Sequence, residues 1–316
     1  MIPKEEKKIN NVYGIVPSRR LGRSLGFSTI PLSTCSYSCV YCQLGRTRNM
    51  TVERQNFFLI DDLILQLEEY QDKKDAFDVI TLVGEGEPTL YAQTGELIRR
   101  IKLLFEKPVA VITNGSLFFL DEVRQDCLHA DIVMPSLDAW DDDSFRKLNR
   151  PFKTITFEKM YNGLLKFRRE YKGDFYLEIM CVKGITDQGK NIMLLTEKIN
   201  ELKPDKVFVN TPVRPPAEDW VERCPKGFVE DLQKKFKSNK DVEIPDTNLY
   251  SPNFDVYQAI IEIIKRHPLD QSGIDKFCKN RKKDTERIIK RLSEDTQVER
   301  IKYENKVFYR INLKKR

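Results

Sequence analysis

The sequence predicts an α/β fold built on a parallel sheet, because short β-rich runs alternate with amphipathic stretches over the first 220 residues. The β-rich runs are apolar throughout, which is typical of strands that helices cover. Six such units form either an incomplete barrel or a doubly wound sheet, and the alternation is the same for both. We expect strands at residues 27–32, 79–83, 109–113, 132–137, 176–182 and 207–211.

Helices are expected between these strands, where apolar residues recur at helical spacing. They lie at residues 61–70, 95–105, 157–171 and 189–202. Since the carboxyl ends of parallel strands meet at one edge of a sheet, polar residues that follow the strands are candidates for a functional site.

The pattern changes after residue 237. Residues 241–253 are polar and contain Pro245 and Pro252, which indicates a linker between a core domain at 1–240 and a second domain at 254–316. In the second domain we expect helices from residue 257, near 274–277 and at 284–293, followed by a hairpin of 298–303 with 306–311. Three helices and a hairpin resemble a winged helix.

This second domain carries the positive charge of the chain. From Asp255 to Arg316, 17 Lys and Arg stand against 10 Asp and Glu. A basic winged helix favours a nucleic acid partner, although many winged helices bind protein instead. The candidate nucleic-acid contacts are Lys282, Lys283, Arg287, Lys290 and Arg291.

Length and composition predict a soluble enzyme with an appended domain. The chain has 316 residues, of which 40% are hydrophobic, and this supports a large core. Residues 1–11 are charged, and no apolar run reaches 18 residues, so we expect neither export nor a membrane span. Seven cysteines without a disulfide-like pattern favour the reducing cytoplasm.

Three cysteines close together, Cys35, Cys39 and Cys42, are the most informative feature. Their thiolates make only three bonds where tetrahedral iron or zinc takes four. The set therefore predicts a catalytic metal site, or a cluster with one exchangeable corner, while a structural zinc site or three structural thiols is the alternative.

The remaining cysteines and the histidines are dispersed and form no second pair of ligands. We expect three of these cysteines to be small buried residues and leave Cys224, in a polar stretch, undecided. Histidine is also scarce, with two in the chain, and this argues against ordinary histidine acid–base catalysis. The residues concerned are Cys127, Cys181, Cys224, Cys278, His129 and His267.

Polar residues follow several expected strands. Gly84, Glu85, Gly86 and Glu87 form a turn in which glycines let the backbone approach a ligand and Glu87 supplies an anion for an ammonium group. Asn114, Ser136 and Asp138 suit ribose hydroxyls, with helix capping as the alternative.

Several arginines are candidates for binding an anionic group. Arg214 stands between prolines and suits a substrate or cofactor carboxylate, or it is an ordinary surface arginine. Arg19, Arg20 and Arg23 precede the cysteines and either neutralise an anionic substrate or form a solvated basic stretch.

The cysteine spacing, with Tyr41 before the last cysteine, resembles the signature of the radical S-adenosylmethionine (radical SAM) superfamily. The flanking residues 16–26 and 42–47 are similar to those of an uncharacterised branch grouped near the wyosine-forming tRNA enzymes, and the resemblance runs from about residue 12 to about residue 223.

The resemblance implies a partial (β/α)6 barrel of the TIM type and two cofactors. The three cysteines would hold three irons of a [4Fe-4S] cluster, and SAM would chelate the fourth. The turn at 84–87 resembles the family's Gly-Gly-Glu motif, with Glu85 in place of the first glycine. The residues that it assigns to cofactor binding are Tyr41, Gly84, Glu85, Gly86, Glu87, Asn114, Ser136 and Asp138.

The implied reaction is reductive cleavage of SAM to a 5′-deoxyadenosyl radical, which takes a hydrogen atom from substrate. An external reductant such as a ferredoxin or flavodoxin supplies the electron. A tRNA base is the first substrate hypothesis, and a peptide or small metabolite is the rival. An iron–sulfur transcriptional sensor is the alternative outside enzymes. Because no cysteine precedes Cys35, wyosine synthesis itself is not expected.

Overall fold

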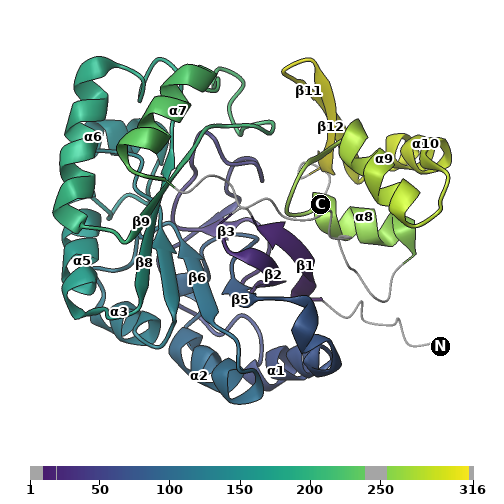
Figure 1. The fold of residues 1–316 in the computed structure, drawn as a ribbon, viewed down its shortest axis with the longest axis horizontal. Coiled ribbons are helices and arrows are strands. Elements are labelled where there is room, and N and C mark those ends of the chain that lie inside the picture. The colour runs from purple at the N-terminus through teal and green to yellow at the C-terminus, as the bar shows by residue number, and fades with distance from the viewer. Residues whose placement is uncertain (1–9, 19, 239–254, 313–316) are drawn as a thin grey trace.

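The core of the protein is a seven-stranded, mostly parallel sheet in the order β1-β2-β5-β6-β7-β8-β9 (Figure 1). The structure is a computed structural model, and it describes residues 10–18, 20–238 and 255–312. Only β1 runs antiparallel to its neighbour. The strands are β1 (Val12–Ser18), β2 (Gly22–Phe27), β5 (Val79–Leu82), β6 (Val109–Thr113), β7 (Ile132–Pro135), β8 (Asp174–Met180) and β9 (Lys206–Asn210).

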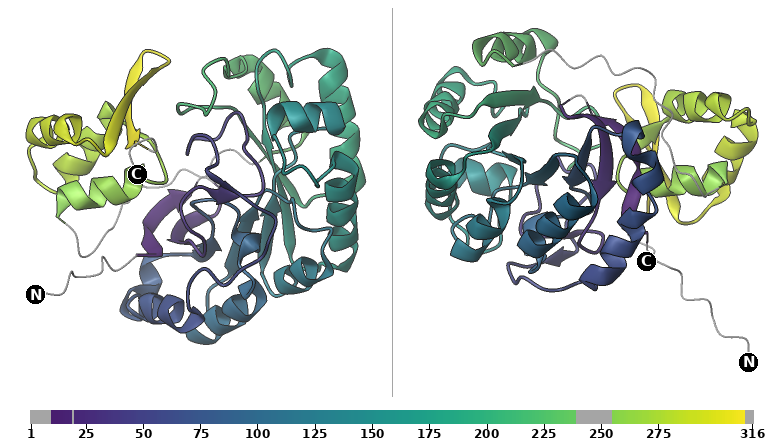
Figure 2. Two further views of the ribbon diagram at one scale, coloured as in Figure 1. Left: turned by 180° about the vertical axis from the view of Figure 1, so that it is seen from behind. Right: turned by 60° about the horizontal axis from the view of Figure 1, so that its bottom comes forward.

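Helices lie along the outer side of this curved sheet (Figures 1 and 2). They are α1 (Ile60–Glu68), α2 (Thr94–Leu104), α3 (Asp121–Cys127), α4 (Asp142–Leu148), α5 (Phe157–Glu170), α6 (Gly189–Leu202) and α7 (Lys226–Lys235), with 3-10 segments at Gln71–Ala76, which is kinked at Lys73, and at Pro88–Leu90. Their apolar faces and the strands form one continuous buried core. The six parallel strands with their helices confirm the α/β prediction.

The register of the strands sets where the polar loops meet. Phe27, Leu82 and Val111 lie side by side in β2, β5 and β6. The residues after them therefore emerge at the same edge of the sheet. Two short parallel segments, β3 (Thr34–Cys35) and β4 (Asn49–Met50), lie beyond this edge.

The strand predicted at residues 27–32 is wrong, because β2 ends at Phe27. Pro31 has no N–H to give to a ladder, and Ser33 takes a positive φ of 63°, so the chain turns there. The true strand contains Gly26, which weakens its β signal. An added Cβ at Gly26 would come within 2.1 Å of the Tyr13 ring in β1, so the close approach of β1 requires glycine.

Residues 255–312, which we call the C-terminal unit, have their own buried core. They comprise α8 (Val256–Ile264), α9 (Gln271–Asn280), α10 (Thr285–Glu294), and a sheet of β10 (Leu269–Asp270), β12 (Lys306–Ile311) and β11 (Val298–Tyr303). The predicted hairpin has its expected strands, and Glu304 and Asn305 both take positive φ at its tip. The winged-helix assignment and the domain bounds stay predictions, and the linker at 241–253 lies outside the described residues.

Among the residues that the structure describes, none of the helices is both long and apolar enough to span a bilayer.

Candidate functional site

The loop that carries the three cysteines is fastened to the end of α4. The backbone amide of Val40 donates to the Leu148 carbonyl at 2.9 Å, and that of Ser38 donates to the Asn149 carbonyl at 3.1 Å. The three cysteines are free thiols and half-buried. The loop thus holds the three cysteines at the carboxyl edge of the sheet.

Amide groups donate to two of the cysteine sulfurs. Asn114 Nδ2 lies 3.4 Å from Cys35 Sγ, and Asn149 Nδ2 lies 3.6 Å from Cys39 Sγ. The Tyr37 amide also donates to Cys35 Sγ at 3.5 Å. Such donors stabilise negative charge on sulfur. Asn149 was missed from the sequence because it follows a helix rather than a strand.

Burial raises the pKa of all three thiols, that of Cys35 to about 12. A bound metal reverses this, since iron binds the thiolate and compensates its charge. In the described part of the chain, no three His, Cys, Asp or Glu side chains gather round one point as a single ion requires. Each thiolate of a [4Fe-4S] cluster binds its own iron, so the half-buried sulfurs with their amide donors fit a cluster.

The loop after β5 packs directly against the cysteine loop. Gly84 has φ of 142°, where other residues are strained. An added Cβ at Gly86 would lie 1.8 Å from the Thr34 carbonyl oxygen, one residue before Cys35. Glycine at position 86 therefore lets the two backbones meet. The predicted approach of a ligand to this turn stays a prediction.

Glu87 is buried, and its carboxylate is hydrogen-bonded on both oxygens. Oε1 accepts from the amide and hydroxyl of Thr89, at 3.0 and 2.6 Å, and from the Thr113 hydroxyl at 2.6 Å. Oε2 accepts from the Asn114 amide at 2.7 Å. Burial raises the pKa of Glu87, and these bonds oppose the rise. Glu87 thus ties the loop after β5 to the end of β6; its role toward an ammonium group stays a prediction, for which Oε2 keeps a lone pair.

Asp138 follows β7 and is buried beneath the cysteine loop. Its carboxylate accepts from the Tyr41 hydroxyl, from Asn149 Nδ2 at 2.8 Å and from the Met180 amide at 2.7 Å. Burial raises the pKa of Asp138 to about 6. These contacts hold the loop in place, and ribose binding by Asp138 or by half-buried Ser136 stays a prediction.

The predicted arginines separate in space. Arg214 donates to Gln43 Oε1 at 3.1 Å, beside Cys42, so it lies at the cysteine loop. Arg20 pairs with Glu178 of β8. Arg23 instead pairs with Asp78 at the surface near the amino end of β5, at 2.6 Å, which favours the solvated alternative for this residue. Arg19 lies outside the described residues.

The candidate nucleic-acid residues lie on or just before α10. This helix is on the side of the C-terminal unit that faces away from the sheet (Figures 1 and 2). All five side chains are exposed, but the Arg291 guanidinium also lies 3.7 Å from the centre of the Tyr257 ring. Arg291 therefore stabilises the unit itself by a cation–π contact.

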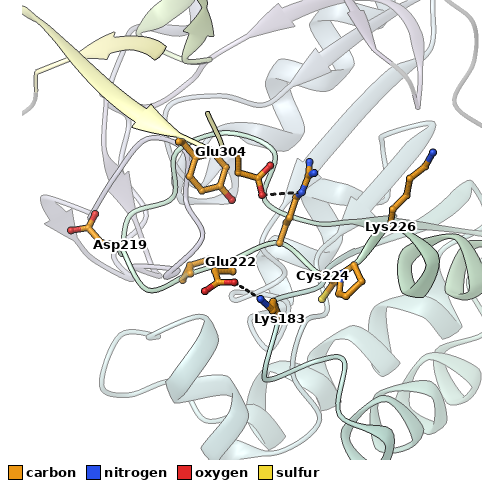
Figure 3. A pocket seen from close by; sticks show the side chains of 10 residues that line it. Lys183, Asp219, Glu222, Cys224, Lys226 and Glu304 are labelled. Atoms are coloured by element: carbon orange, nitrogen blue, oxygen red, sulfur yellow. Dashed lines mark hydrogen bonds and ion pairs between the residues drawn. The ribbon is translucent and has the colours of Figure 1, made fainter. Parts of the chain in front are cut away.

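A separate pocket of about 490 Å³ lies between the hairpin tip and the loop that precedes α7 (Figure 3). Four of its charged residues pair with one another, Lys183 with Glu222 and Arg223 with Glu304, while Lys226 pairs with Glu230 outside the lining. Cys224 is buried in its wall, and burial raises the pKa of this thiol to about 12, which makes it a poor nucleophile. The acidic and basic side chains that line the pocket are equal in number, so its net charge is zero. These residues lie far from the cysteine triplet in the sequence.

The model of the radical SAM superfamily matches residues 29–196, more than half of the chain. The chain belongs to the radical SAM superfamily. It is an enzyme of this class, whose cofactors are a [4Fe-4S] cluster and S-adenosylmethionine.

Relatives of this radical SAM protein cover it to different extents. A UPF0026 protein of Methanocaldococcus jannaschii is 35% identical over 96% of this chain and 97% of its own. A protein named GTPase Obg, from Brachyspira hyodysenteriae, is 41% identical over 76% of this chain, but the chain spans only 35% of that protein. A probable dual-specificity RNA methyltransferase RlmN of a Thermotoga species is 26% identical over 58% of this chain and 54% of its own.

A solved structure shares the fold of this chain. Streptococcus suis SuiB, in complex with its precursor peptide SuiA, aligns with a TM-score of 0.51 at 16% identity, over 71% of this radical SAM chain and 49% of SuiB. This likeness, together with the mostly parallel sheet, supports the partial TIM-type barrel.

Proposed function

We propose that Cys35, Cys39 and Cys42 bind three irons of the [4Fe-4S] cluster and leave the fourth iron to SAM. The observation that carries this is the pair of amide donors, Asn114 and Asn149, placed on two of the three sulfurs. When bound, the cluster and SAM supply reductive cleavage to a 5′-deoxyadenosyl radical and hydrogen-atom abstraction. An external one-electron reductant, such as a ferredoxin or flavodoxin, is required.

The remaining residues of the site bind and orient. The loop after β5 supplies backbone groups at Gly84, Glu85 and Gly86, held in place by the bonds of Glu87. Asn114 reaches both Cys35 and the Ser36 hydroxyl, the latter at 3.0 Å, so it joins the end of β6 to the cysteine loop. Tyr41 and Ser136 are the other proposed SAM contacts, and Arg214, beside Gln43, is the proposed carboxylate contact.

For the substrate we propose an RNA base, with tRNA as the first choice. The exposed basic residues of the C-terminal unit and the named activity of the RlmN relative support it. Because α10 faces away from the sheet, an RNA bound there would have to reach round the unit to present a base to the site (Figure 2). If RNA does not bind, a peptide or small-metabolite substrate is favoured. If SAM is not cleaved, an iron–sulfur sensor is favoured.

Anaerobic reconstitution with iron and sulfide, followed by addition of SAM and dithionite, tests the proposal. We expect 5′-deoxyadenosine from the wild type and none from Cys39→Ala. Stoichiometric zinc without iron in oxygen-free protein would contradict the cluster assignment. A reconstituted cluster that neither binds nor cleaves SAM would favour the sensor.

A further inference from the structure

The C-terminal unit contacts both edges of the open sheet. At one edge, the Arg266 guanidinium lies 4.3 Å from the centre of the Tyr13 ring in β1. At the other, the Tyr303 hydroxyl donates to the Pro212 carbonyl, just after β9, at 3.0 Å, and Arg223 pairs with Glu304 at 2.9 Å (Figure 3). Since β1 and β9 are the outer strands, the unit spans the side on which the barrel is incomplete.

Arg266, just after α8, is the most deeply buried charge in this contact, with 4% of its surface exposed. Its Nη2 lies 3.0 Å from Glu85 Oε1 and 3.2 Å from the Asn10 carbonyl oxygen, and its Nη1 lies 3.4 Å from Glu262 Oε2. A cation so far from water requires such anionic partners, because an unpaired buried charge is strongly destabilising.

Glu85 lies in the loop that we propose to bind SAM. Its side chain occupies the position of the first glycine in the motif that this loop resembles, and glycine has no carboxylate for Arg266. The backbone of Glu85 also accepts a hydrogen bond from the Ser33 amide at 2.6 Å, which connects it to the segment before Cys35. The departure from the motif thus coincides with the contact to the C-terminal unit.

A second contact reaches the cysteine loop itself. Gln43, directly after Cys42, donates through Nε2 to the Arg266 carbonyl at 3.1 Å and to His267 Nδ1 at 3.0 Å. Arg266 therefore contacts both cofactor loops, and His267 contacts the cysteine loop.

We infer that Arg266 is a positioning residue for the cofactor site and that the C-terminal unit forms one wall of that site. Arg266 holds the loop after β5 through Glu85, and with His267 it holds the cysteine loop through Gln43. The part that concerns SAM rests on the proposed function. The unit is thus coupled to cofactor binding, and binding of SAM tightens its contact with the barrel.

Glu85→Gln tests this inference, since it removes the charge and keeps the size of the side chain. Glu96→Gln, which breaks the exposed Glu96–Arg99 pair, is the matched control. Two quantities are measured on anaerobically reconstituted full-length protein: the Kd for SAM by calorimetry, and hydrogen exchange of peptides covering residues 82–91 and 262–270.

We expect Glu85→Gln to raise the Kd for SAM about tenfold, as the loss of an outer-shell contact typically does. Exchange should become faster in both peptides while the iron content stays unchanged, and Glu96→Gln should match the wild type. A Glu85→Gln protein with wild-type affinity and exchange would overturn the inference.

Failure of the proposed function has a different signature. If the wild type binds no SAM, the SAM assignment is wrong, and the exchange of the two peptides alone decides whether Glu85 couples the unit to the loop. If Glu85→Gln does not fold, Gln43→Ala removes the second contact instead. It should speed exchange at 262–270 and weaken SAM binding, and unchanged values for both would overturn the inference.

Discussion

The Tyr41 hydroxyl donates a hydrogen bond to the carboxylate of Asp138, and this bond fastens the cysteine loop to the end of β7. Asn149 donates to the same carboxylate oxygen and also to Cys39 Sγ. A buried aspartate thus organises two groups that flank one proposed iron ligand. The aromatic residue before the last cysteine has a structural role here, in addition to its proposed contact with SAM.

Tyr41→Phe should destabilise the fold by about 1–2 kcal/mol, because the hydroxyl donates to Asp138 and accepts from Asn149 Nδ2 at 3.0 Å, and the usual net value of one hydrogen bond is about 1 kcal/mol. Urea unfolding of the apoprotein measures it. Tyr161→Phe, which removes a hydroxyl bonded to the Lys198 carbonyl, is the control far from the cysteines. Only Tyr41→Phe should also change the visible and EPR spectra of the reconstituted cluster, and identical spectra would contradict its place beside the cluster.

Cys39→Ala should lose the brown chromophore and most of the bound iron, because two thiolates do not retain a [4Fe-4S] cluster that three hold. Iron and sulfide analysis after anaerobic reconstitution measures this. Cys224→Ala is the matched control, since Cys224 is a buried free cysteine that is not part of the triplet. Full iron content in Cys39→Ala would remove this cysteine from the ligand set.

Gly86→Ala should destabilise the protein by about 1–3 kcal/mol and weaken SAM binding, because its Cβ would have to displace the Thr34 backbone. Gly227→Ala is the control. It lies in α7, where an added Cβ meets no atom within 4 Å, so it should be neutral or slightly stabilising. The melting temperatures of the two variants measure the difference. Equal melting temperatures would contradict the prediction, because they would mean that the loop after β5 moves to accommodate the added Cβ at little cost.

Acid should weaken the contact between the C-terminal unit and the barrel through His267. Burial, and then the positive charge of three arginines, lowers the pKa of His267 to about 3 from its ordinary 6.5. The unfolded chain therefore binds a proton below pH 6.5 that the folded chain does not, and stability is lost as the pH falls from 6.5 toward 3, by at most about 1.4 kcal/mol per pH unit. The three arginines are Arg20, Arg214 and Arg266.

His267→Asn provides the comparison for this prediction. The pKa of Asp138, raised to about 6, adds a slope of opposite sign, since a protonated folded carboxyl loses its advantage as the pH rises through 6. The difference between wild-type and His267→Asn unfolding free energies removes that slope. This difference in unfolding free energy should shrink as the pH falls below 6.5. A difference that stays constant with pH would contradict a neutral His267 that accepts a hydrogen bond from Gln43.

If the C-terminal unit binds RNA, affinity should fall steeply with salt, because each neutralised phosphate releases counterions. Lys283→Ala with Lys290→Ala should lower the slope of log K against log salt by about 0.7 to 0.9 for each lost contact. Filter binding with bulk tRNA between about 50 and 200 mM salt measures it. A slope that the double variant leaves unchanged would remove α10 from the interface.

Sequence alone was sufficient for the parts of the protein that depend on local patterns. Apolar runs predicted β5 and β6 closely, helical periodicity predicted α6 within its observed bounds, and the Glu304-Asn305 turn predicted the terminal hairpin. The three cysteines, 4 and 3 residues apart, predicted the family, because ligand spacing is a local property. The bounds of β2 were not predicted, because Gly26 is required by the close approach of Tyr13, and only the folded sheet brings Tyr13 near.

The tertiary structure decided which distant residues share the site. Asn149, 110 positions beyond Cys39, carries no signal in the sequence, and Glu85 reads as a departure from a motif until Arg266 is seen beside it. Hydrogen bonds and buried ion pairs of this kind depend on the packing of elements far apart in the chain. A local pattern specifies the element that a residue belongs to, while its partner is fixed only when the sheet and the C-terminal unit come together.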